Sequence, residues 1–281
     1  MARVAVFAVA YFSAHEIAGL AASIRRSTGG HLIDICVLDN SGDADEIAKL
    51  REIPEIDHLV PSAVNLGYGA GMNALKSALT ASYDWYLVCN PDVRVEPETI
   101  DLLIQAGGRH PDAGLLGPRI LGSDGQIYPS ARVFPSIRTG VGHALFVRVW
   151  PCNPWIRRYH RIRPHVDEDT EIDWLSGAFL LARPDAFRSV KAFYDNFFMY
   201  YEDVDLAFRL AKHGWRAWCI PSAAIEQSGA HATRSNAGVM RKVHHRSAAR
   251  YLDKKYVGWW LAPVRWTLRF GLFVRREFFR G

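Results

Sequence analysis

The stretch VAVFAVAYFS, residues 4–13, decides the fold of this chain. Its six apolar residues, Val4 to Val9, are typical of a short strand that is buried on both faces. A helical pattern follows from Ala14 to Ser27, which is the order found where a strand feeds a crossover helix. The stretch therefore predicts a βα unit at the start of the chain.

The same alternation of short apolar runs and helical patterns continues after it. Further strands are expected at 33–38, 58–60 and 85–89, with helices at 43–51 and 70–81. The 281 residues, 49% of them apolar and 22% charged, suffice for one large α/β domain or a domain with an appendage. The βαβα order predicts a parallel sheet that binds ligands at the carboxyl ends of its strands.

Polar side chains gather where the predicted strands end. The second strand runs into residues 39–41 (DNS), the third into 65–67 (NLG) and the fourth into 90–92 (NPD). Because the carboxyl ends of parallel strands share one edge of a sheet, we expect these residues to line one ligand site. Ordinary turn chemistry is the alternative, since Asn, Asp, Gly and Pro also populate turns.

Residues 65–73, NLGYGAGMN, hold three glycines at the start of a predicted helix. A dinucleotide-binding fingerprint would follow the first strand instead, and the phosphate loop of nucleoside triphosphatases would need Gly-Lys-Ser/Thr. We expect the glycines to let backbone N–H groups approach a nucleotide or phosphate at the helix N-terminus.

Residues 197–206, FFMYYEDVDL, place three carboxylates within four positions, at Glu202, Asp203 and Asp205. The apolar spacing behind them predicts a helix that stops at Gly214. The helix N-terminus favours ionised acids, whereas adjacent carboxylates raise each other's pKa. A carboxylate subject to both effects suits a general base that deprotonates a hydroxyl group. Simple helix capping is the alternative.

Two features bear on the compartment. The N-terminal run lacks the basic start and small-residue cleavage site of a signal peptide, so we expect a strand there and no leader. The four cysteines, Cys36, Cys89, Cys152 and Cys219, show no close pairing and no Cys-x-x-Cys motif. Reduced thiols in a cytoplasmic protein without a zinc site are therefore expected.

Charge is unevenly distributed along the chain. Its 34 Lys and Arg against 29 Asp and Glu give a net charge of +5. Residues 231–281 hold 12 of these bases and 2 of the acids, a local charge of +10, which leaves −5 for the rest. A basic tail on an acidic body predicts an anionic surface as its partner.

A second basic segment, residues 131–165, contains seven arginines and no acid. It could bind nucleic acid, a pyrophosphate or an anionic lipid headgroup, or could be a solvated connection between elements. No known DNA- or RNA-binding module surrounds it, so we expect no nucleic-acid partner.

The C-terminal residues 256–281 are rich in aromatic residues and arginine. On a helix, the arginines at 265, 269, 276 and 280 fall within about 60° of one another, and most of the remaining surface is apolar. The uncharged run 256–264 is too short to span a bilayer. This predicts a helix lying in an anionic membrane interface, with docking onto the body or onto a second copy in a homodimer as the alternative.

Residues 171–181, EIDWLSGAFLL, predict one strand with Gly177 in its interior. A glycine inside a strand marks close approach by a ligand or by another backbone, or a bulge.

Taken together, the motifs resemble those of the inverting family 2 glycosyltransferases with the GT-A fold, in particular their bacterial rhamnosyltransferase-like branch. The similarity spans roughly residues 3–230 and rests on six segments, which are VAY 9–11, LDNS 38–41, NLGYGAGMN 65–73, CNPDV 89–93, WLSGAF 174–179 and FFMYYEDVDL 197–206. It implies an α/β GT-A domain over 1–230, a Rossmann-like sheet flanked by helices. Its nucleotide-binding half is 1–121 and its acceptor and catalytic half is 122–230. The helical segment 231–281 follows.

The resemblance also implies roles for single residues. Asp203 is the general base, supported by Glu202 and Asp205. Asp39 contacts the pyrimidine base, and Asp92 holds a Mg²⁺ or Mn²⁺ ion that bridges the donor diphosphate. The other residues implied to contact the nucleotide sugar are Tyr11, Asn65, Gly67, Gly69, Asn73, Asn90, Trp174 and Gly177.

One position departs from the family. Many relatives have a histidine after the strand that follows the acidic helix, where it completes the metal site. In this chain Glu226 and Gln227 lie at about that position, and the next histidine is His231. We expect that Glu226 or His231 takes this role, or that the metal is held by Asp92 and the donor phosphates alone.

The implied protein is a cytoplasmic transferase, peripheral on the inner face of the cell membrane. It moves a sugar from a nucleoside-diphosphate donor to a hydroxyl of a lipid-linked or cell-envelope glycan. The expected sugar is L-rhamnose, with dTDP-rhamnose as the donor. One rival is a sugar-1-phosphate nucleotidyltransferase, which needs a glycine-rich N-terminal loop with Arg and Lys for the triphosphate. The loop after residues 9–12 lacks these residues. The other is a basic binding protein for membrane or nucleic acid, in which Asp92 and Asp203 would be dispensable.

Overall fold

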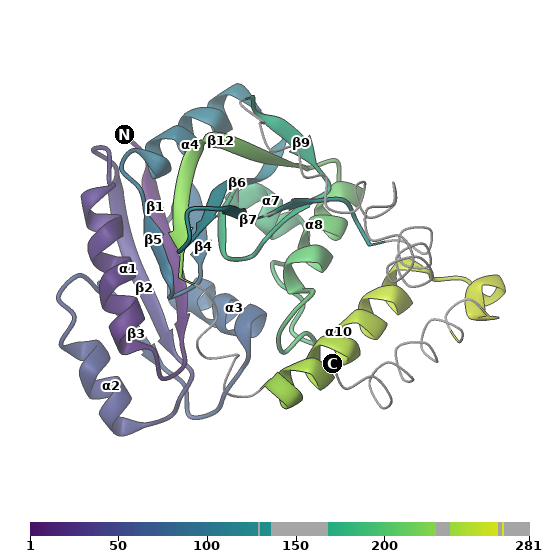
Figure 1. Ribbon diagram of the computed structural model, residues 1–281, viewed down its shortest axis with the longest axis horizontal. Coiled ribbons are helices and arrows are strands. Elements are labelled where there is room, and N and C mark those ends of the chain that lie inside the picture. The colour runs from purple at the N-terminus through teal and green to yellow at the C-terminus, as the bar shows by residue number, and fades with distance from the viewer. Residues whose placement is uncertain (129, 136–167, 229–236, 264–265, 267–281) are drawn as a thin grey trace.

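The computed structural model describes residues 1–128, 130–135, 168–228, 237–263 and 266 (Figure 1). The strands are β1 Arg3–Ala10, β2 Leu32–Asp39, β3 His58–Pro61, β4 Trp85–Cys89, β5 Val93–Val95, β6 Ala113–Gly122, β7 Ile127–Tyr128, β8 Ala131–Arg132, β9 Thr170–Ile172, β10 Trp174–Leu175, β11 Phe179–Ala182 and β12 Arg216–Gln227. The helices are α1 Ala14–Arg26, α2 Ala44–Arg51, α3 Tyr68–Ala78, α4 Thr99–Arg109, α7 Pro184–Ser189, α8 Glu202–Lys212 and α10 Ala237–Lys255, and a 3₁₀ turn covers Trp259–Leu261.

Ten of these strands form one sheet in the order β3-β2-β1-β4-β11-β6-β12-β5, with β7 paired to β6 and β9 to β12. The first four strands are parallel, as predicted, and Ala10 lies opposite Asp39 at their carboxyl ends. Beyond these four strands the sheet is mixed, because β11 runs antiparallel between β4 and β6. A separate ladder pairs β8 with β10.

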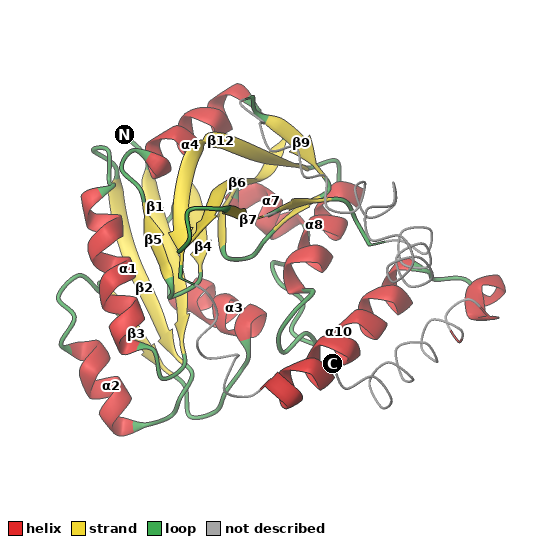
Figure 2. Ribbon diagram, viewed as in Figure 1, coloured by secondary structure: helices red, strands yellow, loops and turns green. Residues whose placement is uncertain are grey.

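Both faces of the sheet are buried, which explains the unbroken apolar run of β1. Val6 and Ala8 pack into one core with α1, α2 and α4. Phe7 and Val9 face the other core, formed with α3, α7, α8 and α10. Figure 2 shows α1 and α2 on one side of the strands and α3, α8 and α10 on the other.

Two predicted elements differ from the structure. Residues 171–181 do not form one strand but contribute to β9, β10 and β11, with Gly177 between the last two. The chain leaves the ladder there because the Gly177 N–H and carbonyl groups bind side chains instead, those of Asp203 and Tyr68. The predicted helix 70–81 begins at Tyr68 and ends at Ala78.

The C-terminal region is described only in part. Its first portion forms α10, which packs into the body through Tyr251, a fully buried side chain. Most of the predicted amphipathic helix, and Cys152, lie outside the described residues; Cys36, Cys89 and Cys219 are free thiols. None of the described helices is both long and apolar enough to cross a membrane. The division of the chain at residue 230 stays a prediction.

Candidate active site

The acidic helix α8 begins after an unusual turn. Tyr200 and Tyr201 both have left-handed backbone, with φ of 66° and 69°. Residues other than glycine keep such angles only where their surroundings hold them. His244 of α10 packs against both tyrosine rings with centroids 5.4 Å apart, and Ser247 donates a hydrogen bond to the Met199 carbonyl at 2.8 Å. Helix α10 therefore holds the turn from which the acids start.

Asp203 is fixed by two backbone donors. Its Oδ2 accepts a hydrogen bond from the Gly177 N–H at 2.9 Å, and its Oδ1 accepts one from the Val204 N–H at 2.7 Å. Burial raises the pKa of Asp203, while both N–H groups and the charge of Arg132 act to lower it. The side chain is oriented and partly desolvated, as a general base requires.

Glu202 lies in a different environment from its neighbour. Its side chain is buried, and Oε2 has no hydrogen-bond partner among the described residues. Burial, with the charge of Asp203 as a smaller cause, raises the pKa of Glu202 to about 8. Glu202 is thus the neutral member of the pair near pH 7.

Tyr68 connects the acids to the glycine loop. Its hydroxyl donates a hydrogen bond to the Gly177 carbonyl at 2.7 Å. Burial raises the pKa of Tyr68, and the charges of Glu202, Asp203 and Asp92 raise it further. Acids that are far apart in sequence therefore act on one ring, whereas a shared ligand site at the strand ends stays a prediction. Tyr68 has no distinctive sequence signal, although it lies between two of the loop glycines.

The loop glycines have a packing role in the structure. A Cβ on Gly67 would lie 2.2 Å from the Phe198 carbonyl oxygen, and Gly67 also has a φ of +81°. A Cβ on Gly71 would lie 2.8 Å from Val9, so no side chain fits at either position. A Cβ on Gly69 would meet Phe193 at 3.1 Å. The glycines bring α3 against β1 and against the segment before α8, whereas their approach to a nucleotide stays a prediction.

The end of β2 is tied to the same loop. Asp39 is fully buried and accepts hydrogen bonds from the N–H and hydroxyl of Ser41 and from the N–H of Gly42. Asn40 donates to Asn65 Oδ1 at 3.0 Å and to the Gly67 carbonyl at 3.1 Å. Asp39 therefore organises its own loop, and its contact with a nucleotide base stays a prediction.

Asp92 follows β4 and faces β12. Its carboxylate accepts hydrogen bonds from the Gln227 amide at 3.2 and 3.3 Å. Burial, the largest influence, raises the pKa of Asp92. The expectation that Glu226 would join Asp92 does not fit the strand, because neighbouring residues point to opposite faces and Gln227 faces Asp92. His231 lies outside the described residues.

Three other residues that were predicted to contact the nucleotide sugar form hydrogen bonds within the protein. Asn73 bonds to Phe193 and to the Asp195 carboxylate, and Trp174 donates its indole N–H to the Val133 carbonyl at 3.0 Å. The Asn90 N–H donates to the Ala178 carbonyl. These bonds position the segments around the site, and direct contact with a donor stays a prediction.

Tyr11, by contrast, is open to a ligand. It directly follows β1, and its side chain is 44% exposed. Its ring packs edge-on against Phe12, so an aromatic surface is available at the sheet edge beside the end of β2. This position suits stacking with a base, and that role stays a prediction.

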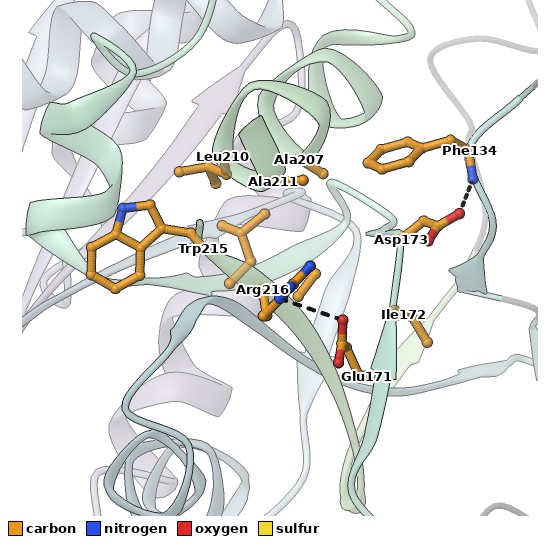
Figure 3. Close-up of a pocket in the computed structure, with 11 residues that line it drawn as sticks. Phe134, Glu171, Ile172, Asp173, Ala207, Leu210, Ala211, Trp215 and Arg216 are labelled. Atoms are coloured by element: carbon orange, nitrogen blue, oxygen red, sulfur yellow. Dashed lines mark hydrogen bonds and ion pairs between the residues drawn. The ribbon is translucent and has the colours of Figure 1, made fainter. Parts of the chain in front are cut away.

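A cavity of about 80 Å³ lies between α8, β9 and the start of β12 (Figure 3). Phe134, Ile172 and Leu210 supply apolar walls, and Asp173 accepts a hydrogen bond from the Phe134 N–H at 2.6 Å. None of the predicted site residues lines this cavity. It is therefore distinct from the arrangement around Tyr68.

Comparison with known proteins gives close relatives. Two proteins of Mycobacterium tuberculosis, from strains H37Rv and CDC 1551, carry the name N-acetylglucosaminyl-diphospho-decaprenol L-rhamnosyltransferase. Each is 39% identical over 280 residues, covering 96% of this chain and 90% of the relative. Rhamnosyltransferase WbbL of Escherichia coli K12 is 36% identical over 89 residues, or 32% of this chain and 34% of that protein. No protein-family model matches.

Solved structures of low sequence identity share the architecture. TarS of S. aureus, residues 1–349 with UDP, superposes with a TM-score of 0.56 at 13% identity, over 99% of this chain and 72% of that one. GalNAc-T7 with UDP, GalNAc and Mn²⁺ gives 0.57 at 11% identity, over 83% of this chain and 44% of that one. At these identities the likeness shows the fold alone.

Proposed function

Because the chain belongs to the inverting family 2 glycosyltransferases, with their GT-A fold and in their rhamnosyltransferase branch, we propose that it moves L-rhamnose from dTDP-rhamnose to a lipid-linked sugar. The donor is inferred from three relatives that are named rhamnosyltransferases. The acceptor is inferred from the two relatives named for a diphospho-decaprenol-linked N-acetylglucosamine. The product would be a precursor of a cell-envelope glycan.

Asp203 is the proposed general base, and its hydrogen bond to the Gly177 N–H at 2.9 Å is the observation that carries the proposal. Each of its oxygens accepts one backbone N–H and keeps a lone pair for the acceptor hydroxyl. As Asp203 takes the proton, the hydroxyl oxygen attacks the anomeric carbon on the face opposite the nucleoside diphosphate. The bond to the diphosphate breaks as the new glycosidic bond forms, so the configuration inverts.

Glu202 supports the base by remaining neutral. A second carboxylate charge beside Asp203 would raise the pKa of Asp203 further and would keep it protonated at neutral pH. Since burial already disfavours the charged form of Glu202, Asp203 carries the charge of the pair. This division resembles other carboxyl pairs in which two environments separate the pKa values.

Asp92 is the proposed ligand for a Mg²⁺ or Mn²⁺ ion. Asp92 is half-buried, and its hydrogen-bond partner, the Gln227 amide, is neutral. Burial raises the pKa of Asp92, so a bound cation would stabilise the ionised carboxylate. No group of three His, Cys, Asp or Glu suited to a metal occurs in the described part of the chain. One carboxylate with phosphate oxygens and waters nevertheless suffices for Mg²⁺. When bound, such an ion would offset charge on the leaving diphosphate.

The proposed location is peripheral, on the inner face of the cell membrane. Val257, Trp259, Trp260 and Trp266 follow α10, and their side chains are 69%, 83%, 66% and 74% exposed. Exposed tryptophans suit the interface between lipid and water, where their rings are partly buried and their N–H groups stay hydrated. The alternative is that these residues dock onto a second copy of the chain.

The test is transfer by the Asp203→Asn variant. We expect turnover from dTDP-rhamnose to fall by about 10²–10⁴-fold, which is the range for loss of a positioned base, while the variant stays folded. The exposed Asp185→Asn on α7 is the matched control and should behave as wild type. Wild-type turnover in Asp203→Asn would remove Asp203 from the mechanism.

Ligand identity is tested separately by thermal shift. UDP-, dTDP- and GDP-sugars are compared with and without Mg²⁺ or Mn²⁺, and Asp92→Asn should abolish the metal-dependent part of the shift. The anomeric configuration of the product, measured by NMR, should be opposite to that of the donor. Release of pyrophosphate from a nucleoside triphosphate and a sugar phosphate would instead favour the nucleotidyltransferase.

A further inference from the structure

The guanidinium group of Arg132 is held in a fixed position by its neighbours. Arg132 lies on β8 opposite Trp174 of β10. Its guanidinium carbon is 5.3 Å from the centroid of the Trp174 ring and 5.5 Å from that of Tyr128, and it donates a hydrogen bond to the Tyr128 hydroxyl at 2.9 Å. Trp174 is itself buried and hydrogen-bonded. An arginine stacked on rings in this way loses little additional freedom when it binds an anion.

The same ladder carries the peptide that holds the general base. Ser176, directly after β10, donates its N–H to the Ser130 carbonyl at 3.2 Å. The next residue is Gly177, whose N–H donates to Asp203. Arg132 and Asp203 are therefore anchored to one short piece of backbone.

Electrostatics agree with this placement. The charge of Arg132 acts to lower the pKa of Asp203, which burial raises. Because the two side chains are anchored to one piece of backbone, an anion that binds at Arg132 would lie on the side of the base, where the acceptor enters.

We propose that Arg132 binds the diphosphate of a lipid-diphosphate-linked sugar, and so makes the enzyme select acceptors that carry this group. The inference rests on the proposed function. In such an acceptor the diphosphate is attached to the sugar that is glycosylated, so the anion lies within one sugar ring of the hydroxyl that Asp203 deprotonates. A guanidinium carries five N–H donors in a planar fork that matches the oxygens of a phosphate group.

The test compares two soluble acceptors that differ only in charge. One is a short-chain alkyl diphosphate of N-acetylglucosamine, and the other is the uncharged alkyl glycoside of the same sugar. The measured quantity is the ratio of kcat/KM for the two acceptors, which cancels any general effect of a substitution on Asp203. Wild type should favour the diphosphate, and Arg132→Gln should lower the ratio by about 10- to 100-fold, the range for loss of a charged hydrogen bond.

Two further variants sharpen the result. Arg132→Lys keeps the charge but loses the fork, so its ratio should fall between those of wild type and Arg132→Gln. Arg109→Gln is the matched control, because Arg109 is an exposed arginine on α4 that pairs with Asp169. Its ratio should equal that of wild type. Circular dichroism verifies that each variant is folded, and Arg132→Lys serves if Arg132→Gln is not.

Three results would overturn the inference. An equal loss for both acceptors would mean that Arg132 acts only through the base or the fold. A rise in KM for dTDP-rhamnose without a change in the ratio would assign Arg132 to the donor diphosphate. A wild-type ratio near one would mean that the acceptor diphosphate is not recognised.

A binding measurement separates this inference from the proposed function. Isothermal titration of a short alkyl diphosphate into wild type and Arg132→Gln requires no transfer. If wild type transfers no sugar yet binds the alkyl diphosphate through Arg132, the proposed function fails and the anion site stands. If transfer depends on Asp203 but both proteins bind the alkyl diphosphate equally, the anion site fails and the proposed function stands.

Discussion

At the scale of single residues, adjacent carboxyl groups behave differently because their surroundings differ. Asp203 accepts two backbone N–H groups and lies in the field of Arg132. Glu202, one position earlier, is buried with Oε2 unpartnered among the described groups. The helix N-terminus favours charge on both residues, but burial has the larger influence on Glu202, whereas two backbone donors hold the carboxylate of Asp203. The pair therefore divides into one charged and one neutral acid.

The raised pKa of Glu202 predicts a pH-dependent cost in stability. The folded state keeps its proton up to about pH 8, whereas the unfolded state loses it near the ordinary value of 4.5. Between these values the native state binds more protons, so Glu202 makes unfolding easier as pH rises. Glu202→Gln removes this effect and should gain at least about 1 kcal/mol of relative stability between pH 5 and pH 8.

Urea unfolding of wild type and Glu202→Gln at pH 5, 6.5 and 8 measures this difference. Glu226→Gln on β12 is the matched control, because it makes the same substitution at an exposed glutamate. A constant difference for Glu202→Gln would mean that Glu202 is ionised in the folded protein.

At the scale of elements, α3 depends on the absence of side chains at its start. Gly67 combines left-handed backbone with a carbonyl oxygen at the position of the missing Cβ. Phe198 supplies that oxygen and also accepts the Tyr68 N–H at 2.9 Å. The entry of α3 and the turn before α8 are thus one packed unit.

Replacement of Gly67 by alanine should therefore destabilise the fold. We expect a loss of about 2–5 kcal/mol, which combines about 1–2 for the left-handed backbone and about 1–3 for overpacking. Gly108 on α4 is the matched control, since a Cβ there would meet no atom within 4 Å. Gly108→Ala should be neutral or stabilising by up to about 1 kcal/mol. Equal effects in denaturant titrations would contradict the packing role of Gly67.

Helix α10 is joined to α8 by a buried ion pair. Asp205 is fully buried and accepts hydrogen bonds from Arg209 at 2.7 Å and from Lys254. Arg209 also donates to the Val190 and Ala192 carbonyls. The third acid of the motif therefore has a structural role, which the sequence motif alone did not distinguish from a supporting role in catalysis.

At the scale of the whole molecule, the sequence predicted the parallel strands better than the pairing of the later strands. The first four strands and the acidic helix have strong periodicity and clear end signals, and they lie where they were expected. The antiparallel insertion of β11 depends on long-range pairing, which local pattern does not encode.

Candidate site residues can be chosen from the sequence when their chemistry is distinctive. Asp203 and Asp92 stand in acidic motifs, whereas Asn40, Tyr68 and Arg132 act through contacts that only the fold creates. An asparagine in a turn, a tyrosine in a glycine loop and one arginine among many carry no local signal of their partners. Because successive residues of a strand point to opposite faces of the sheet, Gln227 lies beside Asp92 and Glu226 does not.

The tail should separate membrane binding from catalysis. A chain that ends at Tyr256 loses the exposed tryptophans but keeps the α10 contacts to Met199 and Asp205. We expect its flotation with anionic liposomes to fall by about tenfold or more. Transfer to a soluble acceptor should persist. Unchanged flotation would place the membrane contact elsewhere or favour a partner subunit.

The dependence of the Tyr200–Tyr201 turn on α10 has a consequence for biosynthesis. The acids leave the ribosome before the helix that holds their turn, because His244, Ser247 and Lys254 are translated later. In a nascent polypeptide the parallel strands are therefore complete before α10 is available to hold the turn that precedes Asp203. We expect the proposed base to be positioned only once α10 has been made, so competence for the proposed transfer arises after the sheet has formed.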